Sequence, residues 1–314
     1  MPKLDYQKST VYFRDRWLPF KEANLSIASS PVLYGLSIYT VFNAIWNKNT
    51  KQLNIFRLKD HYKRLCNSSR IMDFADFSKS HSFTDFEKIM LELLDRNSVQ
   101  EDVLVRVTIF VDELVAGTKI HGLKNSLSAY VYPMGEILPR SGINVCISSW
   151  TRASDNMIPA RAKVNGQYVN ASLMKNEAIL NGYDEAIALD DSGHVSEGTV
   201  ANLFLVRDGK LITPDMSTDI LEGITRDTIM KLADHLGIQH EQRPVDRTEL
   251  YIADEAFMCG SSAHITPILS VDKRQIGSGK LGAITSQLAE LYRQVQAGDI
   301  DKFSDWLTKA NDKT

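Results

Sequence analysis

Apolar and polar residues follow two different periods along this chain. Alternating or strongly β-branched stretches predict strands. We expect strands at 33–46, 103–111, 126–132, 143–149, 185–189, 202–206, 210–212 and 255–258. Apolar residues at helical spacing predict helices at 58–72, 168–180, 225–236 and 282–297. Thr84, with Glu87 three residues later, fits a capping box that opens another helix ending near Arg96.

The order of these elements indicates the fold class. Strands and helices are mixed without a regular strand-helix-strand rhythm, which favours an α+β fold over a doubly wound sheet. A chain of 314 residues is long enough for two compact domains. Turn-rich residues around 133–135 and 139–142 mark the boundary. We therefore expect a smaller N-terminal α/β domain at 1–133, an interdomain loop at 134–142 and a larger cofactor-binding domain at 143–314.

Composition narrows the class of function. Hydrophobic residues make up 43% of the chain and charged residues 24%, as in an ordinary globular protein. The net charge of -3 provides no basic surplus for nucleic acid, so a small metabolite is the expected partner. The three cysteines are scattered without metal-ligand spacing, so we expect free thiols and no metal site. No apolar stretch is long enough to cross a bilayer, and a cytoplasmic location is expected.

Three short segments have the chemistry of an anion or cofactor site, and each also has an ordinary interpretation. Gly223 precedes a predicted helix whose first N–H groups, at Ile224 and Thr225, suit a phosphate, although the stretch is also a normal helix start. The segment 259–263 is a small-residue turn that could receive an anion or be a plain turn. Glu197 is either a solvated loop charge or a semi-buried carboxylate with a cationic partner.

Lys163 is the fourth candidate. It lies between small and apolar residues ahead of the helix predicted at 168–180. Most lysines in such places are on the surface. A buried lysine has a depressed pKa, which suits an imine-forming amine.

Taken together, these segments resemble one known family, the class IV (fold-type IV) pyridoxal-phosphate aminotransferases, and most of all branched-chain amino acid aminotransferases. The resemblance covers about residues 25–300, including Tyr34-Gly35 and Phe56-Arg57-Leu58. The ordered motifs are 158–163 (IPARAK), 165–170 (NGQYVN), 182–190 (GYDEAIALD), 195–198 (VSEG), 201–204 (ANLF), 221–226 (LEGITR) and 253–260 (ADEAFMCG).

The resemblance implies a role for each matching residue. Lys163 forms the Schiff base with pyridoxal 5'-phosphate (PLP) and moves the substrate Cα proton. Glu197 faces the pyridine nitrogen and keeps it protonated, and Tyr168 packs beside the cofactor. The phosphate is held by Arg57, Ile224, Thr225 and Ser261. The substrate pocket is lined by Tyr34 (from a neighbouring subunit), Tyr39, Leu104, Arg106 and Ser262.

The same resemblance implies a fold like that of D-amino acid aminotransferase, with the cofactor at the domain junction, in a homodimer or a higher homo-oligomer. The implied reaction is transamination between leucine, isoleucine or valine and 2-oxoglutarate.

The substrate side departs from the branched-chain pattern. The usual tyrosine two residues before the pocket arginine is Leu104 here, and the usual glycine and arginine after Tyr39 are missing. Met134 replaces a common tryptophan, and His264 replaces a common acidic residue. Two alternatives therefore stay open on the same fold, a D-amino-acid or (R)-amine transaminase and an aminodeoxychorismate lyase.

Overall fold

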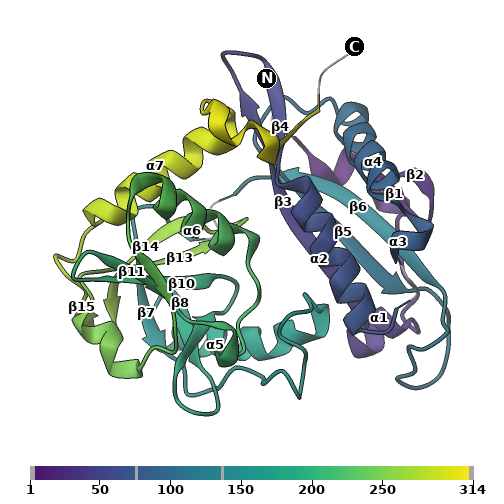
Figure 1. Ribbon diagram of the computed structural model, residues 1–314. Coiled ribbons are helices and arrows are strands. Elements are labelled where there is room, and N and C mark those ends of the chain that lie inside the picture. The colour runs from purple at the N-terminus through teal and green to yellow at the C-terminus, as the bar shows by residue number, and fades with distance from the viewer. Residues whose placement is uncertain (1–3, 75–76, 136–137, 311–314) are drawn as a thin grey trace. The chain divides into compact units, whose positions relative to one another are not determined.

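The computed structural model describes residues 4–74, 77–135 and 138–310 of the chain. They form two compact units, each with its own sheet (Figure 1). The first unit holds the chain up to Gly135, Ala162–Gly166 and the stretch from Gln294 onward. The second unit holds the residues up to Arg161 and then Gln167–Arg293. Helices and strands are mixed in both units, so the predicted α+β class is confirmed.

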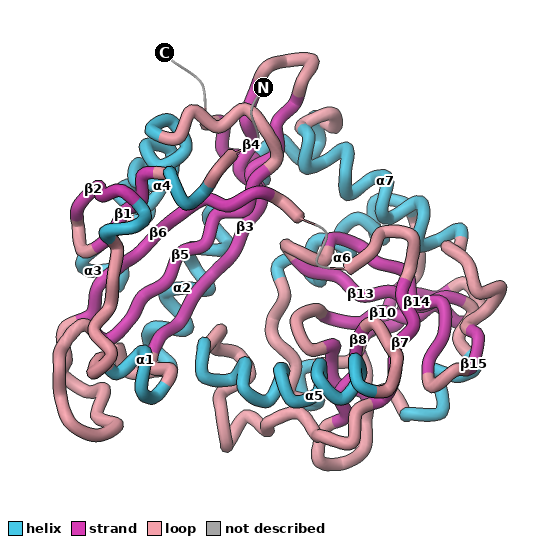
Figure 2. Tube along the Cα trace, turned by 180° about the vertical axis from the view of Figure 1, so that it is seen from behind, coloured by secondary structure: helices cyan, strands magenta, loops and turns pink. Residues whose placement is uncertain are grey.

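The first unit is built on an antiparallel sheet of seven strands in the order β16-β4-β3-β5-β6-β1-β2 (Figure 2). The strands are β1 (Thr10–Phe13), β2 (Arg16–Pro19), β3 (Ser37–Asn47), β4 (Gln52–Phe56), β5 (Val103–Val111), β6 (Asn125–Pro133) and β16 (Leu307–Lys309). The helices are α1 (Ser30–Tyr34), α2 (Leu58–Ile71), α3 (Phe77–Ser80) and α4 (Phe83–Arg96).

Helix α2 packs on one face of β3. Its buried residues Leu58, His61 and Leu65 have the spacing seen in the sequence, whereas Ile71 at its end is 45% exposed. The Phe42 ring of β3 lies 5.4 Å from the His61 ring, measured between centroids. Because side chains alternate along a strand, Tyr39 and Val41 point to the opposite face of the sheet.

The start of α4 differs from the expectation. Ser82, rather than Thr84, is the N-cap, because the Ser82 hydroxyl accepts a hydrogen bond from the Asp85 N–H and the Asp85 carboxylate accepts one from the Ser82 N–H. Both serine and threonine are followed three residues later by an acidic residue, so the sequence pattern alone fits either start.

The second unit is built on a mixed sheet in the order β12-β11-β10-β13-β14-β7-β8-β9, with β15 beside β14. The strands are β7 (Ile143–Ile147), β8 (Glu185–Leu189), β9 (Val195–Gly198), β10 (Asn202–Arg207), β11 (Lys210–Thr213), β12 (His240–Gln242), β13 (Glu255–Gly260), β14 (His264–Val271) and β15 (Arg274–Gln275). The helices are α5 (Tyr168–Leu180), α6 (Ile224–Leu236) and α7 (Ala283–Ala297), and the end of α7 from Gln294 belongs to the first unit.

Small residues let α5 approach the sheet of the second unit closely. Ala171, Met174 and Ala178 on the helix pack against Ala186 and Ala188 of β8. A second and larger apolar cluster includes Val145 of β7, Leu203 of β10 and Met258 of β13. The strands that support the candidate residues Glu197 and Ser261 are therefore anchored in a closely packed core.

The grouping of the Lys163 segment differs from the division read from the sequence. Residues 162–166 belong to the first unit, as do the last residues from Gln294, although both follow the expected boundary. The expected interdomain loop at 134–142 includes positions 136 and 137, which lie outside the described residues.

Candidate active site

The Lys163 segment lies beside the first half of β3. Strand β4 pairs with β3 only from Ala44 onward, which leaves the earlier part of that edge without a β4 partner. There Val164 forms an antiparallel bridge with Ile38, and the Tyr39 N–H donates to the Lys163 carbonyl at 3.0 Å. The Lys163 N–H also donates to the Ser68 hydroxyl of α2 at 3.2 Å. Backbone hydrogen bonds on two sides therefore fix the base of this half-buried lysine.

Two glycines allow the chain to approach itself closely next to this lysine. Gly35 ends α1 with a φ of 68°, a conformation that favours glycine. A Cβ added to Gly35 would lie 2.8 Å from the Cα of Gly166, so a side chain there requires the backbone to move. This contact gives a physical reason for the glycine that follows Tyr34, whereas a Cβ on Gly166 would come no closer than 3.6 Å to another atom.

Tyr39 connects two cationic side chains in the first unit. The Lys163 Nζ lies 5.0 Å from the centroid of the Tyr39 ring, and the Arg106 Cζ lies 3.8 Å from the same centroid. Such cation–π contacts are attractive because the ring faces are electron-rich. The strand register pairs Val41 with Arg106 and Asn43 with Leu104, so Leu104 and Arg106 lie on the same face of the sheet as Tyr39.

Arg57 occupies a left-handed backbone position at the start of α2. Its φ is 51°, which is uncommon for a residue with a side chain. The Arg57 Nε donates to the Asp60 carboxylate at 2.6 Å, and its guanidinium lies 5.1 Å from the Trp306 ring centroid. The buried Arg57 side chain is thus held between an acid and an aromatic ring.

His61 is buried near three cations. Burial holds the pKa of His61 well below its usual range, and the positive charges of Arg64, Arg57 and Lys163 lower this pKa further. The His61 Nδ1 lies 2.7 Å from the Thr40 hydroxyl. The imidazole is therefore neutral at physiological pH and adds no charge around Lys163.

In the second unit, Glu197 is a buried carboxylate with a cationic partner. It lies on β9, where all four residues are buried. The Arg152 Nη2 lies 2.5 Å from the Glu197 Oε1, and both side chains are only 7% exposed. Glu197 Oε2 accepts from the Asn202 side-chain amide at 2.8 Å and from the Leu221 N–H at 3.2 Å. Of the two alternatives left open by the sequence, the paired and buried carboxylate is the correct one.

Helix α6 begins where the sequence suggested an anion-binding site. It starts at Ile224, and the N-cap is Gly223, which has no side chain to cap the first turn. A Cβ at Gly223 would lie 1.8 Å from the Asn202 Oδ1, so a side chain there would have to displace an amide that is hydrogen-bonded to Glu197 and to the Leu221 carbonyl. The buried Arg226 anchors this turn, since its guanidinium donates to the Thr213 hydroxyl at 3.0 Å and to the Pro214 carbonyl at 2.8 Å. The helix start is therefore rigid and suited to an anion.

The small-residue turn expected at 259–263 begins later in the structure. Strand β13 continues to Gly260, and the turn consists of Ser261, Ser262 and Ala263. Strand pairing extends this far because Gly260 pairs with His264 across the turn. The hydroxyl of Thr266 donates to the Ala263 carbonyl at 2.8 Å and holds the turn closed. Both serines are half-buried.

Comparison with known proteins decides the family. The family model described as amino-transferase class IV matches residues 38–271. The chain belongs to the class IV aminotransferases.

Several proteins are similar to this aminotransferase over nearly its whole length. A "Probable branched-chain-amino-acid aminotransferase" from Aquifex aeolicus is 39% identical over 305 residues, covering 96% of this chain and 97% of the relative. The branched-chain-amino-acid aminotransferase of Escherichia coli is 33% identical over 314 residues, covering 98% of each chain.

Solved structures agree in fold. The branched-chain aminotransferase of Thermoproteus uzoniensis with norvaline has a TM-score of 0.91 and 35% identity, covering 96% of this chain and 99% of that one. The branched-chain amino acid aminotransferase of Thermobaculum terrenum in its PLP form has a TM-score of 0.91 and 34% identity, covering 98% of this chain and 100% of that one. The family, the fold and the aminotransferase activity expected from the resemblance are thereby confirmed, and PLP is its cofactor.

The structure brings the candidate residues of this aminotransferase together in two groups. Lys163, Tyr39, Leu104, Arg106 and Arg57 belong to the first unit, and Tyr34 there is 41% exposed. Tyr168, Glu197, Ile224, Thr225, Ser261 and Ser262 belong to the second unit. Tyr168 opens α5 and packs against the apolar cluster beneath that helix.

Two residues that hold Glu197, Arg152 and Asn202, were not predicted from the sequence. Asn202 lies within a quoted motif, and that was a usable signal. Arg152 lies in an irregular segment 45 residues before Glu197, and nothing in its local pattern indicates the contact.

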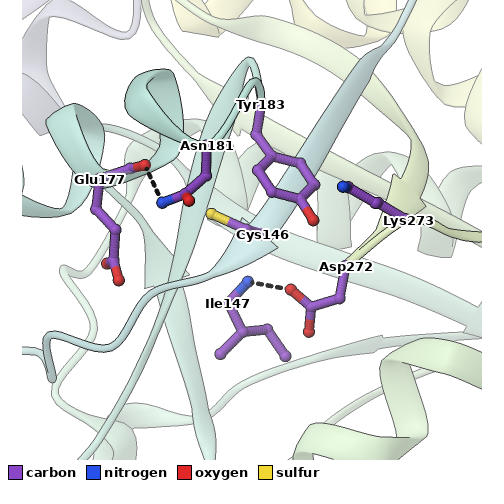
Figure 3. A pocket seen from close by; sticks show the side chains of 7 residues that line it. All are labelled: Cys146, Ile147, Glu177, Asn181, Tyr183, Asp272 and Lys273. Atoms are coloured by element: carbon purple, nitrogen blue, oxygen red, sulfur yellow. Dashed lines mark hydrogen bonds between the residues drawn. The ribbon is translucent and has the colours of Figure 1, made fainter.

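The second unit of the aminotransferase also has a pocket of about 260 Å³ lined by Cys146, Ile147, Glu177, Asn181, Tyr183, Asp272 and Lys273 (Figure 3). None of the predicted site residues is among these seven. Burial and the nearby Glu177 carboxylate raise the pKa of the Cys146 thiol to about 11. The Asp272 Oδ1 accepts from the Ile147 N–H at 2.9 Å. The thiol stays protonated at neutral pH and is a poor nucleophile.

Within residues 4–74, 77–135 and 138–310, no three or more His, Cys, Asp or Glu side chains are grouped so that they could hold a metal ion. No helix in these ranges has the length and apolar character needed to span a membrane.

Proposed function

We propose that this aminotransferase transfers an amino group between a branched-chain amino acid and 2-oxoglutarate. The observation that carries the proposal is the environment of Arg106. Its guanidinium is half-buried on the sheet face that also holds Tyr39, Val41 and Leu104, and no described carboxylate forms an ion pair with it. An apolar face with one available cation suits both an aliphatic side chain and the distal carboxylate of 2-oxoglutarate.

The residues in each unit fit the demands of PLP. In the second unit, the uncapped start of α6 and its N-cap Gly223 suit a phosphate, with Thr225 and Ser261 as further donors. Arg57 in the first unit would supply positive charge to the same phosphate. Glu197 would stabilise a protonated pyridine nitrogen, because a buried carboxylate favours a neighbouring cation. Tyr168 would pack beside the ring.

When bound, PLP supplies the electron sink that makes the substrate Cα proton acidic. Lys163 would hold the cofactor through its Nζ, and the same amine, once free, would move the substrate Cα proton. Tyr39 and the hydrogen-bonded backbone of residues 163–164 would keep that amine in place. The Ser262 hydroxyl would receive the substrate α-carboxylate.

Assembly and location remain predictions. Tyr34 at the end of α1 would reach the substrate pocket of a neighbouring subunit, which requires at least a homodimer. Its side chain is 41% exposed in the single chain, so it is available for such a contact. We place the enzyme in the cytoplasm.

A donor panel tests the proposed substrates. Purified enzyme is given L-leucine, L-isoleucine, L-valine, the D-enantiomers and an (R)-amine, each with 2-oxoglutarate or pyruvate. We expect the three L-amino acids with 2-oxoglutarate to be the best pairs. Turnover restricted to D-amino acids or (R)-amines would replace the proposal with the transaminase alternative. Release of pyruvate from aminodeoxychorismate without a new amino acid would favour the lyase.

The role of Arg106 is tested by single-turnover kinetics of the two half-reactions. A hydrogen bond to a charged group contributes about 1.5–3 kcal/mol, so Arg106→Ala is expected to weaken the 2-oxoglutarate half-reaction roughly 10- to 150-fold. The leucine half-reaction, which has no distal charge, is expected to change much less. Equal losses in both would assign Arg106 to the α-carboxylate or to the fold.

A further inference from the structure

Neutral groups hold the guanidinium of Arg106. The Arg106 Nη2 donates to the Asn165 Oδ1 at 2.6 Å, and the Arg106 Cζ lies 3.8 Å from the centroid of the Tyr39 ring. An arginine has five N–H donors in a rigid fork. A neutral acceptor and an aromatic face fix the orientation of this fork without neutralising its charge. The remaining donors are then available to an anion.

Asn165 is itself held in one orientation. Its Nδ2 donates to the Ser37 hydroxyl of β3 at 2.8 Å, while its Oδ1 accepts from Arg106. A flip of the amide would turn the Nδ2 donors towards the Arg106 guanidinium, which has no acceptor, and would lose that hydrogen bond. The backbone is fixed on either side, because Val164 is bridged to Ile38 and Gly166 lies against Gly35.

This arrangement links the lysine segment to the arginine. Asn165 is only two residues beyond Lys163, so one short segment carries both the reactive amine and the acceptor that orients Arg106. A carboxylate at position 165 would have a similar shape, but it would pair with Arg106 and compete with any incoming anion.

We propose that Asn165 is a positioning residue that sets the enzyme's preference for a dicarboxylic amino acceptor by orienting Arg106. This inference rests on the proposed role of Arg106 as the site of the distal carboxylate. Asn165 acts through Arg106 and not on the reacting atoms, so its effect is confined to substrates with a distal negative charge.

Asn165→Asp is the sharpest variant, because it keeps the shape and adds the competing charge. The two half-reactions are measured separately by single-turnover kinetics, with Asn24→Ala as a matched surface control whose amide contacts only the Lys21 carbonyl. We expect the 2-oxoglutarate half-reaction of Asn165→Asp to fall about 10-fold or more, mainly through weaker binding, since a charged hydrogen bond is lost to the competitor. The leucine half-reaction is expected to stay within about threefold.

A double-mutant cycle separates this inference from the proposed function. Asn165→Ala is made in the native enzyme and in Arg106→Ala. If Asn165 acts through Arg106, its replacement weakens the 2-oxoglutarate half-reaction only where Arg106 is present. Equal losses in both backgrounds, or equal losses in both half-reactions, would overturn the inference and leave Asn165 as a structural residue.

Each failure has its own signature. If Arg106→Ala weakens the 2-oxoglutarate half-reaction selectively while both Asn165 variants behave like the native enzyme, the inference is wrong and the proposed function stands. If Arg106→Ala itself has no effect on 2-oxoglutarate, the proposed acceptor site is wrong and the inference falls with it. Retention of the native melting temperature and PLP content shows that each variant is folded.

Discussion

The Arg152 Nη2 lies 2.5 Å from the Glu197 Oε1, and both side chains are buried in the second unit. Removing one partner of a buried ion pair leaves a charge that neither water nor a counter-ion compensates. Arg152→Ala is therefore expected to lower the free energy of unfolding by about 3–5 kcal/mol. Chemical denaturation of the native enzyme and the variant measures the difference.

The neutral double variant Arg152→Met with Glu197→Gln serves as the control. It removes both charges, so it should recover most of the stability lost in Arg152→Ala. A single variant as stable as the native enzyme would mean that Glu197 does not depend on Arg152.

Glu197→Gln tests the role of the carboxylate in the reaction. The amide preserves the shape and the hydrogen bond with Asn202, but it removes both the ion pair with Arg152 and the charge proposed to keep the pyridine nitrogen protonated. We expect turnover to fall far more than PLP content, because the proposed phosphate contacts are unchanged. Steady-state rates are compared with bound PLP per subunit. Normal turnover in the variant would show that Glu197 is only a structural residue.

Gly223→Ala tests the proposed anion-binding site at the start of α6. The new Cβ would meet the Asn202 Oδ1 at 1.8 Å, so either the Asn202 amide or the first turn of the helix has to move. Losing one charged hydrogen bond of about 1.5–3 kcal/mol predicts a PLP dissociation constant at least about 10-fold higher. Titration of the apo enzyme measures it. Gly135→Ala, where a Cβ meets nothing within 4 Å, is the matched control and should bind PLP normally.

Because His264 is buried in its neutral form, we expect the enzyme to lose stability in mild acid. Burial, with the positive charge of Arg140, lowers the pKa of His264 from 6.5 to about 4. Between these values the unfolded chain binds a proton at His264 more readily than the folded chain does. The contribution of neutral His264 to the free energy of unfolding is therefore complete above pH 6.5 and is lost as the pH falls towards 4. The slope is at most about 1.4 kcal/mol per pH unit. Urea denaturation of the native enzyme and His264→Gln across this range should give a shallower dependence for the variant, and equal slopes would contradict the assignment.

The sequence predicted elements best where local periodicity and burial agree. The strand at Val103–Val111 and the helix at Tyr168–Leu180 have the bounds expected from their patterns, the strand because it is rich in β-branched residues and the helix because Ala171, Met174 and Ala178 are buried at helical spacing. The start of α4 was predicted two residues late, since two overlapping capping patterns compete and the helix uses the one formed by Ser82 and Asp85. The end of β13 was missed because pairing with β14 extends a strand through small residues that resemble a turn.

In the candidate site, too, features within one short segment were predicted from the sequence, and contacts between distant segments were not. Lys163 and Gly223 were found because their motifs are local. The Arg152–Glu197 pair and the Asn165–Arg106 hydrogen bond join residues that are far apart in the chain, so no local pattern contains them. Whether Glu197 was solvated or buried also depended on the strands that surround it.

The proposed roles of all the other residues depend on the assignment of the cofactor to Lys163. Borohydride reduction of the PLP-loaded enzyme, followed by proteolysis and mass spectrometry of the labelled peptide, tests this assignment. We expect one phosphopyridoxyl group per chain, located on Lys163, and we expect Lys163→Ala to bind PLP without becoming labelled and to lose several orders of magnitude in turnover. A label on another lysine, or near-native turnover of Lys163→Ala, would contradict it.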